Sequence, residues 1–141
     1  MVTTSIDGRE LIEGWVDEDP AIRYRFDFAL HAGNGAESTA VVYFEIEPGS
    51  SLASHRDSAE EVILVLDGEG VATVGDERVA VRSGDLALVP ALVPHGMEAT
   101  GERTLRCVGF FSAASLEHVF EQVQQPLGVS VVHTPFVGVP A

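Results

Sequence analysis

Two histidines and two carboxylates stand in the middle of the chain in an order that could hold a metal ion. Asp57 lies two positions after His55, and Glu61 lies four positions after Asp57. His95 comes later in the chain, directly after a proline. Imidazole nitrogens and carboxylate oxygens are common protein ligands of divalent transition metals. If the fold brings these four side chains into one interior, they form a divalent metal site.

Strand geometry decides which of these side chains share a side. On an extended strand, residues two apart point the same way, so His55 and Asp57 face one interior. The next apolar run, Glu61–Leu66, follows directly after Glu60. Because neighbouring residues point to opposite faces, only one of Glu60 and Glu61 can face inward. The apolar alternation that follows favours Glu61.

The rest of the chain is typical of an all-β protein, with short apolar runs separated by Gly, Pro and Asp. Many short strands joined by short turns indicate a sandwich or a barrel. Besides the segment that carries His55 and Asp57, the expected strands are Tyr24–Leu30, Val41–Glu47, Glu61–Leu66, Val71–Val74, Arg78–Arg82, Leu86–Val89, His95–Ala99 and Thr104–Phe111.

The C-terminal region follows a different pattern. Leu116, Val119, Phe120 and Val123 recur at helical spacing after a serine that can cap a helix, which predicts a short helix over Ala113–Gln124. The tail that follows, 129–141, is apolar, and we expect it to pack against the domain or a second subunit.

Composition bounds the class of protein. The 141 residues suit one domain, 1–141. The net charge is −14, and all eight basic residues are arginine, which argues against nucleic acid and against an anionic membrane as partners. The single cysteine, Cys107, excludes an intrachain disulfide, so a reducing, cytoplasmic location is expected. No segment has the charge and length of a signal peptide or a membrane span.

The spacing of these residues resembles the two motifs of the cupin superfamily. The first motif runs Gly, five residues, His-x-His, three or four residues, Glu, six residues, Gly; here Gly49 to Gly68 reads GSSLASHRDSAEEVILVLDG. The second runs Gly, five residues, Pro-x-Gly, two residues, His, three residues, Asn; here Gly84 to Ala99 reads GDLALVPALVPHGMEA, with Leu92 at the glycine position and Ala99 at the asparagine position. The resemblance implies a double-stranded β-helix (jelly-roll barrel) with a core at about 24–111, followed by the helix and tail at 113–141.

The resemblance also implies a ligand set. His55, Glu61 and His95 match family positions that ligate metal, whereas Asp57 stands where a second histidine is usual. If Asp57 ligates through its oxygen, the site favours Fe, Mn or Ni over copper, with Zn as a further candidate. If Asp57 turns away, the other three form the two-histidine, one-carboxylate set of non-haem Fe(II). The alternative is a metal-free barrel in which the histidines are hydrogen-bonded core residues.

Three function classes follow from the resemblance. The first is a metal-dependent dioxygenase acting on a small organic substrate, with Glu61 as both ligand and proton acceptor, as in quercetinase-like relatives. The second is a non-redox lyase, isomerase or decarboxylase that uses the metal as a Lewis acid. The third is a metal-free binding or sensor domain. Because cupins commonly dimerise, a homodimer is expected.

Other polar and sulfur-containing residues carry weaker predictions. Met97 lies two positions after His95 and should either line the same pocket or pack in the core. His31, His118 and His133 have no ligand spacing, so solvated or capping roles are expected for them.

Overall fold

The computed structural model describes residues 1–136, which form an all-β barrel and one short 3-10 turn, Ala32–Asn34. The strands are β1 (Ile12–Val16), β2 (Asp19–Leu30), β3 (Ala40–Ile46), β4 (Ser51–Asp57), β5 (Glu61–Asp67), β6 (Glu69–Val74), β7 (Glu77–Arg82), β8 (Leu86–Val89), β9 (His95–Ala99), β10 (Leu105–Phe111), β11 (Leu116–Gln124) and β12 (Val129–Thr134). The predicted all-β jelly-roll class is confirmed, and the expected strands at 86–89 and 95–99 have the predicted bounds.

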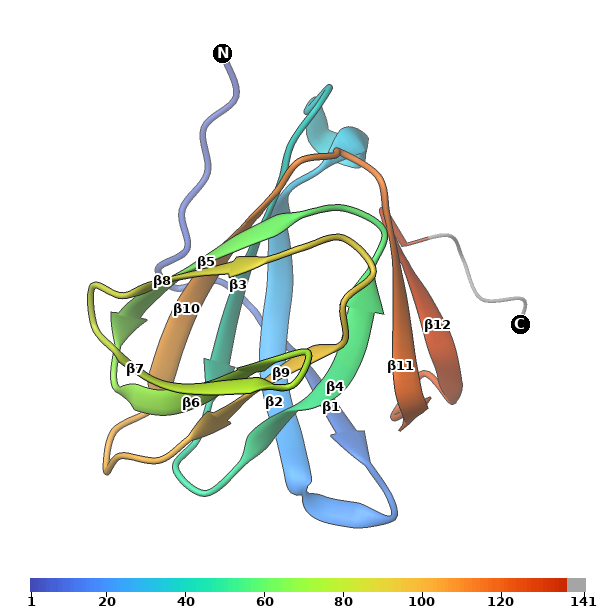
Figure 1. Ribbon diagram of the computed structural model, residues 1–141. Helices are drawn as coiled ribbons and strands as arrows, with labels where there is room; N and C mark the ends of the chain where they lie inside the picture. The colour runs from blue at the N-terminus through green and yellow to red at the C-terminus, as the bar shows by residue number, and fades with distance from the viewer. Residues whose placement is uncertain (137–141) are drawn as a thin grey trace.

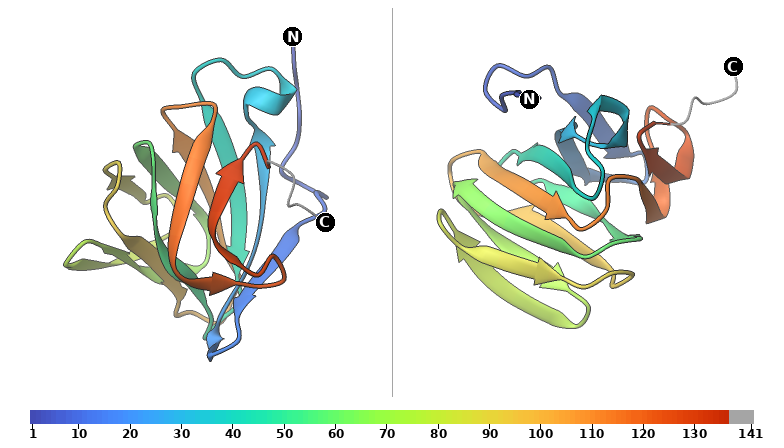
Figure 2. Two further views of the ribbon diagram at one scale, coloured as in Figure 1. Left: turned by 90° about the vertical axis from the view of Figure 1, so that its right-hand side faces the viewer. Right: turned by 90° about the horizontal axis from the view of Figure 1, so that it is seen from above.

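The strands curl into two facing layers (Figures 1 and 2). One layer has the order β8-β5-β10-β3-β2, with β1 added to β2, and its pairs are antiparallel. The other has the order β7-β6-β9-β4, with the β11–β12 hairpin added to β4. A short parallel pairing, Ile22 with Ser51, joins the layers between β2 and β4. The donors predicted to hold metal therefore lie on strands from both layers.

The barrel interior is filled by side chains that alternate along each strand. On β3, the inward residues Ala40, Val42, Phe44 and Ile46 are all buried. The partner strand β10 contributes Leu105 and other buried residues to the same core. Alternation with a period of two is what a strand needs to bury one face, and it fixes which residues of each strand point inward.

The helix predicted over Ala113–Gln124 is wrong, because residues 116–124 form strand β11. At the start of β11, every second residue is buried: Leu116 and His118 point inward and Glu117 points outward. β11 pairs with β4, so that His118 lies opposite Asp57. Pairing with the free edge of β4 outweighs the helical spacing of the apolar residues, since strand preference is set mainly by tertiary context.

The apolar tail packs partly as expected. Residues Val129–Thr134 form β12, which pairs with β11 rather than standing free (Figure 1). The last part of the predicted tail, 137–141, lies outside the described residues. Among residues 1–136, no helix has the length and apolar character needed to cross a membrane.

Candidate metal centre

Three strands bring the four predicted donors together inside the barrel. His55 and Asp57 both point inward from β4, Glu61 is the first residue of β5, and His95 is the first residue of β9. The register of β4 with β9 places His55 opposite His95. Their exposed fractions are 8% for His55, 2% for Asp57, 3% for Glu61 and 3% for His95. Glu60, the alternative to Glu61, is exposed outside the barrel.

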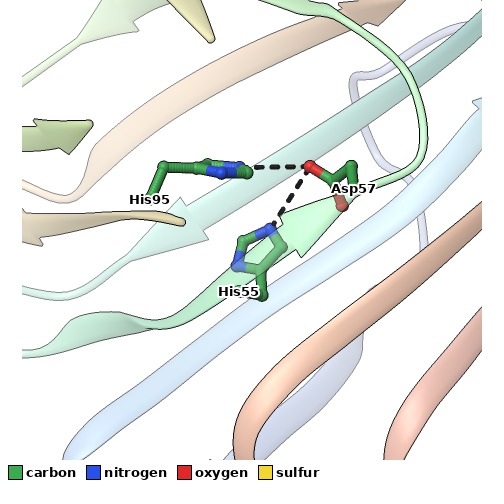
Figure 3. A group of neighbouring side chains, drawn as sticks. All are labelled: His55, Asp57 and His95. Carbon is green, nitrogen blue, oxygen red and sulfur yellow. Dashed lines mark ion pairs between the residues drawn. The ribbon is translucent and has the colours of Figure 1, made fainter. Parts of the chain in front are cut away.

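The donor atoms of His55, Asp57 and His95 point toward one another (Figure 3), and Glu61 adjoins this group through His95. His95 Nε2 lies 3.1 Å from Asp57 Oδ2 and 3.5 Å from Glu61 Oε1, and His55 Nε2 lies 3.7 Å from the same Asp57 oxygen. The ligand atoms of His55, Asp57 and His95 all lie within 4.8 Å of one another. Asp57 Oδ2 and His95 Nε2 are buried without a hydrogen-bond partner in the described part of the chain. Buried polar atoms are normally paired, so this arrangement fits a cation held between them.

Backbone carbonyls orient both imidazoles of this group. His55 Nδ1 lies 2.7 Å from the Ala53 carbonyl oxygen, and His95 Nδ1 lies 3.0 Å from that of Val93. A neutral imidazole that donates Nδ1–H to a carbonyl carries its lone pair on Nε2. The same arrangement orients histidine ligands in metal sites. Both rings are therefore set to offer Nε2 to a metal.

Burial and charge shift the pKa values of the four donors in different directions. Burial lowers the pKa of His55 to about 4, so this ring is neutral. Burial also acts to lower the pKa of His95, but the Asp57 and Glu61 carboxylates outweigh it and raise that pKa to about 10. For Asp57, contacts with His118 and His95 outweigh burial and lower the pKa. For Glu61, burial dominates and raises the pKa. In the metal-free chain, the proton on His95 thus balances charge between two carboxylates.

A glycine on β10 leaves room for the Glu61 carboxylate. Gly109 pairs with Ile63 of β5 and Val42 of β3, so its α-carbon faces the interior beside Glu61. A β-carbon at Gly109 would collide with the Glu61 carboxylate and lie 2.9 Å from Val42 Cγ1. The position of Glu61 in the site therefore depends on residue 109 having no side chain.

His118 was expected to be solvated or capping, and that expectation is wrong. The residue is 6% exposed, and its Nδ1 lies 2.5 Å from Asp57 Oδ1. Its Nε2 lies 2.8 Å from Thr134 Oγ1. The pairing of β11 with β4 creates these contacts, and no spacing along the sequence links His118 to the motif 61 residues earlier.

Met97 lies in the hydrophobic core and not in the wall of the cavity beside the four donors. It is 3% exposed. The core-packing alternative describes its position.

The four donors form part of the wall of a cavity of about 240 Å³. Aromatic and aliphatic side chains dominate the rest of the wall, and the C-terminal hairpin and the segment after it contribute part of it. These lining residues include Ile12, Phe26, Phe28, Val42, Phe44, Leu52, Ile63, Phe111, Phe120, Leu127, Val132 and Phe136. Within residues 1–136, no arginine lines the cavity, whereas the acidic residues Glu13 and Asp27 do. The cavity suits an uncharged, apolar molecule better than an anion.

Comparison with known proteins points to one family. The family model of the cupin domain matches residues 42–111. Quercetin 2,3-dioxygenase of Bacillus subtilis is 36% identical over 72 residues, which are 51% of this chain and 21% of that enzyme. This chain therefore matches only about a fifth of that relative's length.

Solved structures share the fold at low identity. Oxalate decarboxylase of Lactobacillus farciminis superposes with a TM-score of 0.67 at 17% identity, covering 79% of this chain and 33% of that chain. The polyketide cyclase RemF of Streptomyces resistomycificus superposes with a TM-score of 0.63 at 20% identity, covering 79% of this chain and 78% of that chain. One barrel thus serves several chemistries, and the fold alone does not choose among them.

We expect Gly109→Ala to weaken metal binding at least about tenfold, because displacing one ligand disturbs the coordination geometry that the metal requires. Metal content after dialysis, by elemental analysis, measures the effect. Gly101→Ala is the matched control, since its added β-carbon would lie 3.3 Å from the Glu69 side chain, away from the site. Full metal retention by Gly109→Ala would contradict the assignment of Glu61 to the site.

We expect metal uptake at pH 8 to release about one proton per ion, because His95, with a pKa of about 10, must lose its Nε2 proton to bind. Affinity should rise by about tenfold per pH unit as pH approaches that value. Calorimetric titration in two buffers with different ionisation enthalpies counts the protons. A titration heat independent of the buffer would refute the charge assignment.

Proposed function

The chain belongs to the cupin superfamily, and from this premise we propose that it is a metal-dependent dioxygenase acting on a small, largely apolar organic substrate. The observation that carries the proposal is the grouping of two imidazoles and the Asp57 carboxylate beside an apolar cavity, with the Glu61 carboxylate 3.5 Å from His95. The sequence match to a dioxygenase gives further support.

We propose Fe, Mn or Ni as the resident metal, with Zn as a further candidate, held by His55, Asp57, Glu61 and His95. Mixed nitrogen and oxygen donors suit these ions. When bound, such an ion supplies Lewis acidity, and a redox-active one also supplies electron transfer.

The chain's own residues transfer the proton and bind the substrate. Burial raises the pKa of Glu61, which suits this carboxylate to accept a proton from the substrate and return it. In this proposal the aromatic wall, including Phe28 and Phe120, presents an apolar surface to the substrate. Because the cavity has no arginine in the described chain, a neutral substrate avoids the cost of an unpaired buried charge.

A reducing, cytoplasmic compartment is our proposal for its location. Cys107 is a buried free thiol, and burial raises its pKa to about 12, so it stays unreactive.

We expect the protein reconstituted with Fe²⁺, Mn²⁺ or Ni²⁺ to consume oxygen with neutral aromatic enols or phenols, and not with oxalate. Glu61→Gln should lower the rate by at least about 10²-fold, the usual contribution of a general base. An oxygen electrode follows the reaction, and a panel of substrates tests the charge preference.

Glu60→Gln is the matched control, since Glu60 is the exposed neighbour of the same residue type. Turnover of a substrate without oxygen uptake would instead indicate a non-redox lyase, isomerase or decarboxylase. A protein that retains no metal and turns over nothing would indicate a binding domain.

We propose that the assembly is a homodimer formed through the outer face of β10, β5 and β8. Phe110, Val62 and Leu88 lie in one cross-strand row on this face, and Leu64 lies opposite Leu86 in the next. Leu86, Leu88 and Phe110 are 68%, 59% and 44% exposed. Neighbouring exposed apolar residues on a sheet typically mark a protein interface. In a chain with a net charge of −14, an uncharged patch is the surface where two copies repel least.

We expect Leu88→Glu to convert the dimer to a monomer, because it places two like charges in an apolar contact. Light scattering coupled to gel filtration measures the mass. Val79→Glu, on the exposed side of β7, is the control and should leave the mass unchanged. A monomeric wild-type protein would overturn the proposal.

A further inference from the structure

We infer that His118 and Thr134 of the C-terminal hairpin are positioning residues that make Asp57 a one-oxygen metal ligand. The inference rests on the proposed metal site and adds to it a part of the chain outside both sequence motifs. It concerns the one ligand position at which this sequence departs from the motif.

The two oxygens of Asp57 have different surroundings. Oδ1 accepts a hydrogen bond from His118 Nδ1 at 2.5 Å. Oδ2 has no hydrogen-bond partner in the described chain and faces Nε2 of His95 at 3.1 Å and Nε2 of His55 at 3.7 Å. A hydrogen bond to one oxygen fixes the rotation of the carboxylate. It therefore leaves the other oxygen pointed at the two imidazoles.

Thr134 holds the second ring nitrogen of His118. Because the Asp57 carboxylate can only accept a hydrogen bond, His118 Nδ1 carries the hydrogen and donates it to Oδ1. The Thr134 hydroxyl lies 2.8 Å from Nε2 and can donate to it. Thr134 is 6% exposed, so the chain Thr134–His118–Asp57 runs entirely through the buried interior. The Thr134 hydroxyl thus anchors the far side of the His118 ring, opposite the nitrogen that donates to the carboxylate.

Packing fixes the ring as well as its hydrogen bonds. The His118 ring lies 5.4 Å, centre to centre, from Phe28 and 6.1 Å from Phe111. Two strand pairings fix the position of His118 along the barrel: its partner is Asp57 on β4 and Val132 on β12. Residues that orient the ligands in this way are as much a part of a metal site as the ligands themselves.

The inference explains how an aspartate can serve at a position where the motif has histidine. An imidazole ligand is oriented by one hydrogen bond from its distal nitrogen, as the Ala53 and Val93 carbonyls orient His55 and His95. A carboxylate has no such nitrogen and needs a donor on its second oxygen. His118 provides that donor. It follows that the contribution of His118 to metal binding depends on residue 57 being aspartate.

The test measures Co²⁺ affinity by chelator competition, and the visible absorption of bound Co²⁺, for variants of His118 in two backgrounds. With Asp57 present, His118→Leu should weaken Co²⁺ binding by about 10- to 100-fold and alter the absorption bands. His118→Asn should restore most of the affinity, because its side-chain amide can donate from about the position of Nδ1. Thr134→Val should have a smaller effect of the same sign.

In the Asp57→His background, His118→Leu should change affinity by less than about threefold, since the coupled partner is gone. Val123→Ala, which truncates a side chain that is 44% exposed on β11, is the control and should bind Co²⁺ as the wild type does. Thermal unfolding with chelator present establishes that each variant is folded. If His118→Leu unfolds, His118→Asn and Thr134→Val carry the comparison.

Three outcomes separate this inference from the proposed function. Wild-type protein that binds no Co²⁺ overturns the metal site, and this inference with it. Co²⁺ binding that His118→Leu leaves unchanged, or weakens equally in both backgrounds, overturns the positioning role alone. Co²⁺ binding coupled to His118, together with no oxygen uptake under any condition, overturns the dioxygenase proposal and leaves the positioning role intact.

Discussion

The burial of two carboxylates in an apolar barrel is the constraint on which the site depends. Asp57 and Glu61 are 2% and 3% exposed, in a cavity whose remaining wall is mostly aromatic and aliphatic. An isolated charge in such surroundings is strongly unfavourable unless a cation or several hydrogen bonds compensate it. His95 and His118 supply part of that compensation. The unpartnered Asp57 oxygen marks where the rest must come from.

Backbone geometry places the buried carboxylates beside the imidazoles that compensate them. The two-residue period of β4 aims His55 and Asp57 inward together, and carbonyl groups fix the faces that the imidazoles present. The missing side chain of Gly109 makes space for Glu61. Barrel closure then brings β5 and β9 to the same place. The site is thus a property of strand register, and a slip of one residue in β4 would turn its donors out of the barrel.

Local patterns in the sequence were enough to predict most strands and the grouping of His55, Asp57 and His95. Turn residues bound the strands, and the spacing from Gly49 to Gly68 carries three of the donors. The predictions that were wrong concern features that depend on contacts between distant segments. Residues 116–124 have apolar residues at helical spacing, yet the free edge of β4 makes them a strand. The same pairing buries His118 beside Asp57, which no local signal could reveal. Alternation alone also could not distinguish the core position of Met97 from a place in the cavity.

The C-terminal hairpin also affects the order in which the molecule can mature. Chains are synthesised from the N-terminus, and folding can begin before synthesis ends. The barrel strands β2 to β10 precede His118 and Thr134 in the chain. His118 and Thr134 are synthesised after the four donors, so the hydrogen-bond donor for Asp57 and one wall of the cavity join the site together, with β11 and β12.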